Sequence, residues 1–141
     1  VIHLIPTHLE VDEEHKREVE LAGMKAVMDY EKKNGRKHKD VSQLNLGYDI
    51  ESLDPSTGEI RYIEVKSFET TGDPELTEHE YEIARALASR YWLYIVENAL
   101  TNPSIKIIRD PINTTTIIKI RRESYKIVKV YENRYIVKLG G

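Results

Sequence analysis

The sequence predicts a mixed α/β fold with helices packed on a sheet, and three features carry that prediction. Residues 10–33 repeat apolar side chains at helical spacing, which predicts a long helix. Residues 46–53 and 59–68 have strand-like composition on either side of a Pro/Gly turn, which predicts a β-hairpin. Residues 91–97 are almost continuously apolar, which is typical of a strand covered on both faces.

Length and composition limit the class of protein. The chain has 141 residues, of which 40% are hydrophobic and 32% charged, so it predicts a single globular domain over 1–141. It has no cysteine, which excludes disulfides and thiolate metal sites. Without a signal segment or a run of membrane-spanning length, the expected location is the cytoplasm. The start at Val1 and the end at Gly140-Gly141 fit either removal of an initiator Met before Val1 or a domain excised from a longer protein, and we favour the excised domain.

The first half of the chain supplies the predicted helix and hairpin. The helix ends near Lys32 and Lys33, with Gly35 as its stop, and a basic loop follows over 35–39. The hairpin turn is Pro55-Ser56-Thr57-Gly58.

The second half begins with another helix and continues with strands. Thr77 and Glu80 have capping-box spacing, so they predict a helix that runs to about Ser89. A strand over 105–109 follows the apolar one. The segments 115–120, 125–131 and 134–139 alternate apolar and polar residues, so they predict a C-terminal β-meander. We therefore expect a core at about 10–112 and a basic, β-rich extension at 113–141.

The hairpin fixes a register that brings charged residues together. If Asp54 pairs with Glu59, Asp49 lies opposite Glu64, with Lys66 on the same face. The other face then pairs Tyr48 with Val65 and Ile50 with Ile63 as a core layer.

Two carboxylates that face each other in a sheet repel, so another group must compensate the charge of Asp49 and Glu64. Lys66 supplies one positive charge. A divalent cation would supply two, and Mg²⁺ prefers one or two carboxylates together with waters and a phosphate. The alternative is an ordinary surface cluster of charged side chains, which needs no ligand.

Several segments together resemble a known family. Gly47-Tyr48-Asp49-Ile50 and Ile63-Glu64-Val65-Lys66 look like the core of the PD-(D/E)xK nuclease superfamily, which has a restriction-endonuclease-like α-β-β-β-α-β unit. With three further segments they resemble, more narrowly, the C-terminal domain named after the plant protein NO VEIN, over about residues 15–112. The further segments are Val27-Met28-Asp29-Tyr30-Glu31, Leu76-Thr77-Glu78-His79-Glu80-Tyr81 and Tyr91-Trp92-Leu93-Tyr94-Ile95-Val96-Glu97.

The resemblance implies metal-dependent phosphodiester hydrolysis. Asp49, Glu64 and the backbone carbonyl of Val65 would bind Mg²⁺ or Mn²⁺, and Lys66 would orient the attacking water or help to deprotonate it. Glu20 matches an additional acidic position, for which Glu18 and Glu14 are alternatives. Related domains look like appendages of helicases and restriction-type systems, so a helicase or ATPase region is an expected partner. Several superfamily members keep the fold without cleavage.

The end of the chain has the opposite charge to its beginning. Residues 1–100 carry 12 Lys and Arg against 21 Asp and Glu, a balance of −9, whereas residues 101–141 carry 9 against 3, a balance of +6. Basic residues interleaved with tyrosines on strands suit a nucleic-acid surface, with DNA favoured as the partner. The candidates are Arg121, Arg122, Lys126, Lys129 and Arg134. The alternative is the charged outer face of a thermophile protein, which the abundance of Ile, Lys, Glu and Tyr also suggests.

The sequence lacks a phosphate-binding Gly-rich loop, a dinucleotide-binding fingerprint and a serine-hydrolase elbow. Three hypotheses follow for its function. The first is a nuclease-like domain centred on Asp49, Glu64 and Lys66. The second is a non-catalytic DNA- or protein-binding module of the same fold, and the third is a structural accessory domain.

Overall fold

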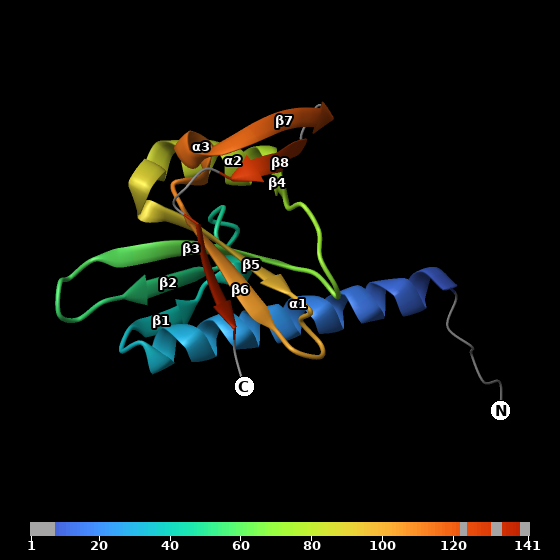
Figure 1. The fold of residues 1–141 in the computed structure, drawn as a ribbon, viewed down its shortest axis with the longest axis horizontal. Coiled ribbons are helices and arrows are strands. Elements are labelled where there is room, and N and C mark those ends of the chain that lie inside the picture. Colours follow the sequence, from blue (N-terminus) through green and yellow to red (C-terminus); the bar gives the residue numbers. More distant parts are fainter. Residues whose placement is uncertain (1–7, 122–123, 131–133, 139–141) are drawn as a thin grey trace.

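A computed structural model describes residues 8–121, 124–130 and 134–138. Its centre is a six-stranded sheet in the order β1-β2-β3-β5-β6-β9, and β4, β8 and β7 form a second sheet of three strands. The first helix runs along one face of the large sheet, while the second sheet and the two shorter α-helices form a separate layer (Figure 1). The helices are α1 (His8–Lys33), η1 (Ser42–Leu44), α2 (Glu78–Leu87), η2 (Ala88–Arg90) and α3 (Pro111–Thr114). The strands are β1 (Lys37–Asp40), β2 (Ile50–Leu53), β3 (Ile60–Ser67), β4 (Glu75–Thr77), β5 (Tyr91–Glu97), β6 (Ser104–Arg109), β7 (Thr115–Arg121), β8 (Ser124–Val130) and β9 (Arg134–Lys138).

The large sheet mixes parallel and antiparallel pairs. β3 and β5 are parallel neighbours, and the crossover between them contains β4 and α2. The pairs β1–β2, β2–β3, β5–β6 and β6–β9 are antiparallel. The order α1-β1-β2-β3-α2-β5 thus agrees with the α-β-β-β-α-β core and with the mixed α/β class expected from the sequence.

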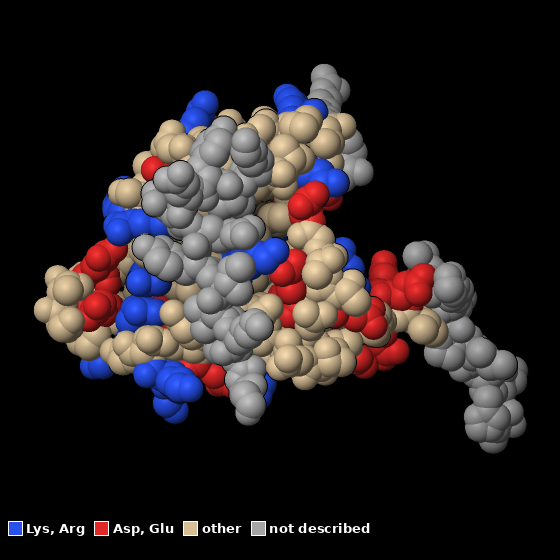
Figure 2. All heavy atoms as spheres, in the orientation of Figure 1, with Lys and Arg blue, Asp and Glu red and all other residues tan. Residues whose placement is uncertain are grey.

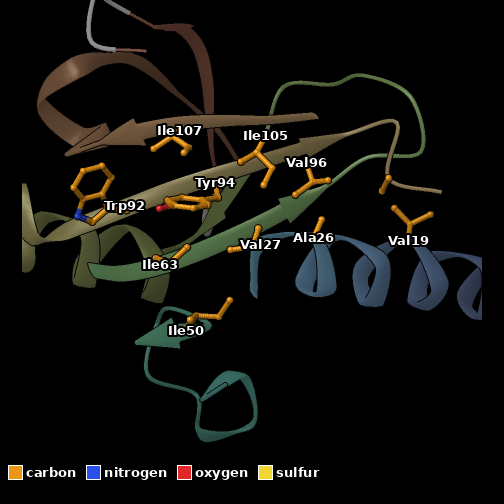
Figure 3. Close-up of a cluster of buried hydrophobic side chains, with 11 residues drawn as sticks. Val19, Ala26, Val27, Ile50, Ile63, Trp92, Tyr94, Val96, Ile105 and Ile107 are labelled. Atoms are coloured by element: carbon orange, nitrogen blue, oxygen red, sulfur yellow. The ribbon is translucent and has the colours of Figure 1, made fainter. Parts of the chain in front are cut away.

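The main hydrophobic core lies between α1 and the large sheet. Val19, Ala26 and Val27 point from the helix toward the side chains of β3, β5 and β6, which include Ile63 and Tyr94 (Figure 3). A second cluster lies on the opposite face of β5, where Leu93 and Ile95 pack with residues of β4, β6 and β8. Every residue of β5 is buried, which confirms the strand that the apolar run 91–97 predicted.

Two differences from the sequence prediction concern strands. The expected basic loop at 35–39 contains an edge strand, β1, whose sequence Lys-His-Lys-Asp carries no apolar residue that would reveal it. The three C-terminal strands do not form one meander. β7 and β8 pair with each other and β8 with β4, whereas β9 adds to β6 at the edge of the large sheet. Alternating apolar and polar residues identify a strand. Which strand it pairs with depends on the sheet edges that the rest of the fold leaves free.

Within the described residues, no helix is long and apolar enough to cross a membrane.

Candidate functional site

The register of the hairpin places Asp49 beside Glu64. Ile50 pairs with Ile63 and Glu51 with Tyr62, as predicted. The Asp49 amide donates to the Ile63 carbonyl at 2.8 Å, and the Val65 amide donates to Oδ2 of Asp49 at 2.8 Å. Asp49 therefore occupies the point where β2 begins, with its carboxylate turned across the backbone of β3.

Tyr48 does not join the core layer, so the predicted pairing of Tyr48 with Val65 is wrong. Its hydroxyl donates to Oε1 of Glu51 at 2.9 Å, and its ring meets Tyr62 edge-on with centroids 5.1 Å apart. The backbone turns at Gly47, which has a φ of +85°. This turn interrupts the strand alternation on which the prediction depended, because β2 begins only at Ile50.

The segment that leads to Asp49 is held from two sides. A Cβ at Gly47 would lie 2.6 Å from Cγ1 of Ile83, so the glycine allows α2 to approach the backbone closely. The buried Tyr91 hydroxyl donates to the Gly47 carbonyl at 2.8 Å. Helix α2 and strand β5 thus both fix the position of Asp49.

Glu80 is a fourth charged residue of the site, although its position in the sequence indicated only a helix cap. Nζ of Lys66 lies 2.8 Å from Oε1 of Glu80 and 3.6 Å from Oε2 of Glu64. Glu80 also completes the predicted capping box with Thr77. The sequence placed Glu80 in the capping box, but no local pattern joined it to Lys66, because the two residues lie on separate elements.

The electrostatics of the cluster follow from burial and mutual repulsion. Burial and repulsion from Asp49 raise the pKa of Glu64 well above its ordinary value. Burial also raises the pKa of Asp49, against the lowering effect of the Val65 amide. Burial alone would lower the pKa of Lys66, but the carboxylates of Glu64 and Glu80 raise it. Burial would likewise raise the pKa of Glu80, which Lys66 and a hydrogen bond with Glu64 instead lower. Lys66 is therefore an ammonium group that lies among three carboxyl groups, those of Asp49, Glu64 and Glu80.

These residues line one pocket of about 600 Å³ at the edge of β3 beyond the start of β2. Glu20 enters its lining from α1, whereas its alternatives Glu14 and Glu18 lie outside that lining. Lys16 and Arg17 are the basic residues of the same helix that line it. Acidic side chains gather along the projecting part of α1 and toward the middle of the molecule (Figure 2).

The donors at the site fit a hard divalent cation. Within the described residues, no group of three or more His, Asp or Glu side chains is arranged to hold a metal ion. The set expected here is smaller, with two carboxylates and a carbonyl. The N–H and C=O of a strand residue point to the same side, so the Val65 carbonyl turns toward Asp49 as its amide does. Two carboxylates, one carbonyl and waters are an ordinary ligand set for Mg²⁺.

The predicted nucleic-acid surface is divided between the two sheets. Lys126 lies on β8, where it pairs with Ile118 of β7. The backbones of Arg121 and Lys129 belong to β7 and β8, that of Arg134 belongs to β9, and Arg122 lies outside the described residues. Tyr125 is partly buried and stacks on Tyr81 at 3.9 Å between ring centroids, so that face of its ring is not open to a base.

The fold and the pocket define a mixed α/β domain with an acidic site at the free edge of a central strand. A family model described as "Protein NO VEIN, C-terminal" matches residues 19–108, a range that includes Glu20, Asp49, Glu64, Lys66 and Glu80. The chain belongs to this family. Searches of curated proteins and of solved structures each found no match.

Proposed function

We propose that the pocket hydrolyses phosphodiester bonds in DNA with the help of Mg²⁺ or Mn²⁺. The observation that carries this proposal is the pairing of the buried Glu64 on β3 with the partly buried Asp49 just before β2, with a pKa raised in each. When Asp49 and Glu64 are both ionised, Lys66 balances only part of their negative charge, because its ammonium also pairs with Glu80. A divalent cation would compensate that charge, and DNA would supply the phosphate oxygens that complete its coordination.

Each residue has a part in the proposed reaction. Asp49, Glu64 and the Val65 carbonyl would hold the metal, which when bound would supply Lewis acidity and a water of lowered pKa. Lys66 would donate hydrogen bonds to the attacking water and to a phosphate oxygen. Its raised pKa favours this role over that of a general base, because the ammonium has no free lone pair. Glu20 would approach from α1 on the other wall of the pocket.

The DNA backbone would enter along the basic residues that border the acidic centre. Lys16 and Arg17 line the pocket and suit contact with phosphates on either side of the cleaved bond. Lys126 and the backbone positions of Arg121, Lys129 and Arg134 extend the proposed contact to the two sheets. A helicase or ATPase region, in this or another chain, would deliver the substrate.

A second function, DNA or protein binding without cleavage, is supported by the position of Lys66. Its ammonium is bonded to Glu80 at 2.8 Å rather than directed to Asp49. If Glu80 and Glu64 take up all three ammonium hydrogens when the metal and DNA are present, none is left for the phosphate and the domain serves as a binding module.

A cleavage assay with matched lysine variants tests the two functions. Lys106 forms a similar half-buried ion pair, with Glu97 at 2.9 Å, so Lys106→Met is the control for Lys66→Met. On linear and circular DNA with Mn²⁺, we expect Lys66→Met to lower the rate by about a hundredfold, because a positioned charge at the phosphate is lost. Lys106→Met should cleave as the wild type does.

The outcomes separate the proposals. Cleavage that is abolished by a chelator and lost in Lys66→Met supports the nuclease. Binding of DNA by the wild type without cleavage of any substrate contradicts the nuclease and leaves the binding module. Equal loss of activity in both lysine variants also contradicts the assigned role of Lys66.

A further inference from the structure

We infer that Glu80 is the positioning residue of this site, which holds the Lys66 ammonium in place and links it to the start of helix α2. This inference rests on the proposed function, because it concerns how Lys66 is presented to the reaction. It adds a residue that comes from a helix rather than from the hairpin region that carries Asp49 and Glu64.

The Glu80 carboxylate contacts Lys66, the Thr77 amide and Glu64. Its Oε1 accepts from Nζ of Lys66 at 2.8 Å and from the Thr77 amide at 2.9 Å. The Glu80 amide in turn donates to Oγ1 of Thr77 at 3.1 Å. The carboxylate is thus fixed by the helix end, and the lysine is fixed by the carboxylate.

Lys66 has two acidic partners with different roles, because Glu64 is a proposed metal ligand and Glu80 is not. Its contact with Glu64 is 3.6 Å, longer than the contact with Glu80. If Glu64 is drawn to a metal ion, Glu80 is the partner that keeps the ammonium in the pocket. A lysine side chain without such a partner has several rotatable bonds, and its charge would spread over many positions.

Helix α2 also fixes the opposite side of the site. Ile83 lies one turn beyond Glu80 and packs against Gly47, two residues before Asp49. One short helix therefore determines the positions of both Asp49 and Lys66.

Three variants, two in α2 and one at its N-cap, separate the loss of the Lys66 contact from a general loss of charge and from a loss of helix capping. Glu80→Gln keeps an oxygen that can accept from the Thr77 amide but loses the charge that holds Lys66. Glu82→Gln makes the same change two residues later, where Glu82 pairs with Arg85 at the surface at 3.3 Å. Thr77→Ala removes the hydroxyl that caps the helix and leaves the Glu80 carboxylate in place.

The first measurement is the NMR signal of the Lys66 ammonium, assigned with Lys66→Met. A held ammonium exchanges its protons slowly enough to give a ¹⁵N-coupled cross-peak. We expect the peak in the wild type, Glu82→Gln and Thr77→Ala, and its loss in Glu80→Gln. A peak that persists in Glu80→Gln overturns the inference.

The second measurement is cleavage with saturating Mn²⁺, where Glu80→Gln should lower kcat by about tenfold or more with little change in KM for DNA. Glu82→Gln should leave kcat unchanged, and an unchanged kcat in Glu80→Gln overturns the inference. If Glu80→Gln does not fold, Glu80→Asp keeps the charge on a shorter side chain and should show an intermediate loss of kcat. A wild-type kcat in Glu80→Asp also overturns the inference. A wild type without metal binding or cleavage refutes the proposed function, and the ammonium signal then decides on the contact alone.

Discussion

Glu64 carries an electrostatic penalty that its neighbours only partly relieve. Its side chain is 4% exposed, and the cation near it, Lys66, is held more closely by Glu80. A carboxylate in this position loses hydration and also meets the charge of Asp49. A residue that costs stability in the isolated domain is typical of a site organised for a ligand.

Replacing Glu64 with glutamine should therefore stabilise the fold at neutral pH. The folded-state pKa of Glu64 lies above its ordinary value, so the native state binds more protons than the unfolded state and stability falls as pH rises between these values. We expect Glu64→Gln to raise the free energy of unfolding by about 1 kcal/mol at pH 8, with the gain shrinking toward pH 4. Urea titrations at several pH values measure this. A variant less stable than the wild type at pH 8 would show that Lys66 already compensates the charge.

At the scale of elements, Glu31 near the end of α1 is connected to β5 by a hydrogen bond from Tyr94 and to the following loop by an ion pair with Arg36. The fully buried Glu31 accepts from Nε and Nη2 of Arg36 at 2.6 and 2.7 Å, and from the Tyr94 hydroxyl at 2.9 Å. Arg61 donates to the same hydroxyl at 2.8 Å. The network connects the helix to the sheet on the face opposite Glu64 and Lys66.

Removing one partner from this network should destabilise the fold strongly. Arg36→Met leaves the Glu31 carboxylate buried with the tyrosine hydroxyl as its remaining partner, which we expect to cost about 3 kcal/mol of unfolding free energy. Arg85→Met breaks an exposed pair with Glu82 and should change stability by less than about 0.5 kcal/mol. Denaturant midpoints of the two variants provide the comparison. Equal, small effects would mean that Glu31 takes up its proton when Arg36 is lost.

Elements with a local signal were predictable from the sequence, and contacts between distant elements were not. The first helix, the hairpin register and the capping box depend on residues close in the chain, and each agrees with the structure. Strand β1 has no apolar residue, and Tyr48 follows a turn at Gly47 that alternation does not reveal. The salt bridge of Lys66 with Glu80 and the docking of β9 on β6 join separate segments of the chain, so no local pattern specifies them.

For the whole molecule, the fold converts separated acidic residues into one pocket. Glu20, Asp49, Glu64 and Glu80 come from α1, the start of β2, β3 and α2 and line a single pocket beside Lys66. The net charge of −3 conceals this local excess as well as the basic end of the chain. Charge of both signs on one small domain suits a site that holds a cation and a polyanion together.

Calorimetric titration with Mn²⁺ tests the central claim most directly, with Glu64→Gln as the site variant and Glu97→Gln as its control. Glu97 is also a buried glutamate, but it pairs with Lys106 away from the pocket. We predict saturable binding in the wild type and in Glu97→Gln, and loss of binding in Glu64→Gln even though that variant is more stable. Wild-type Mn²⁺ affinity in Glu64→Gln, or no binding by the wild type, would contradict a metal site at Asp49 and Glu64.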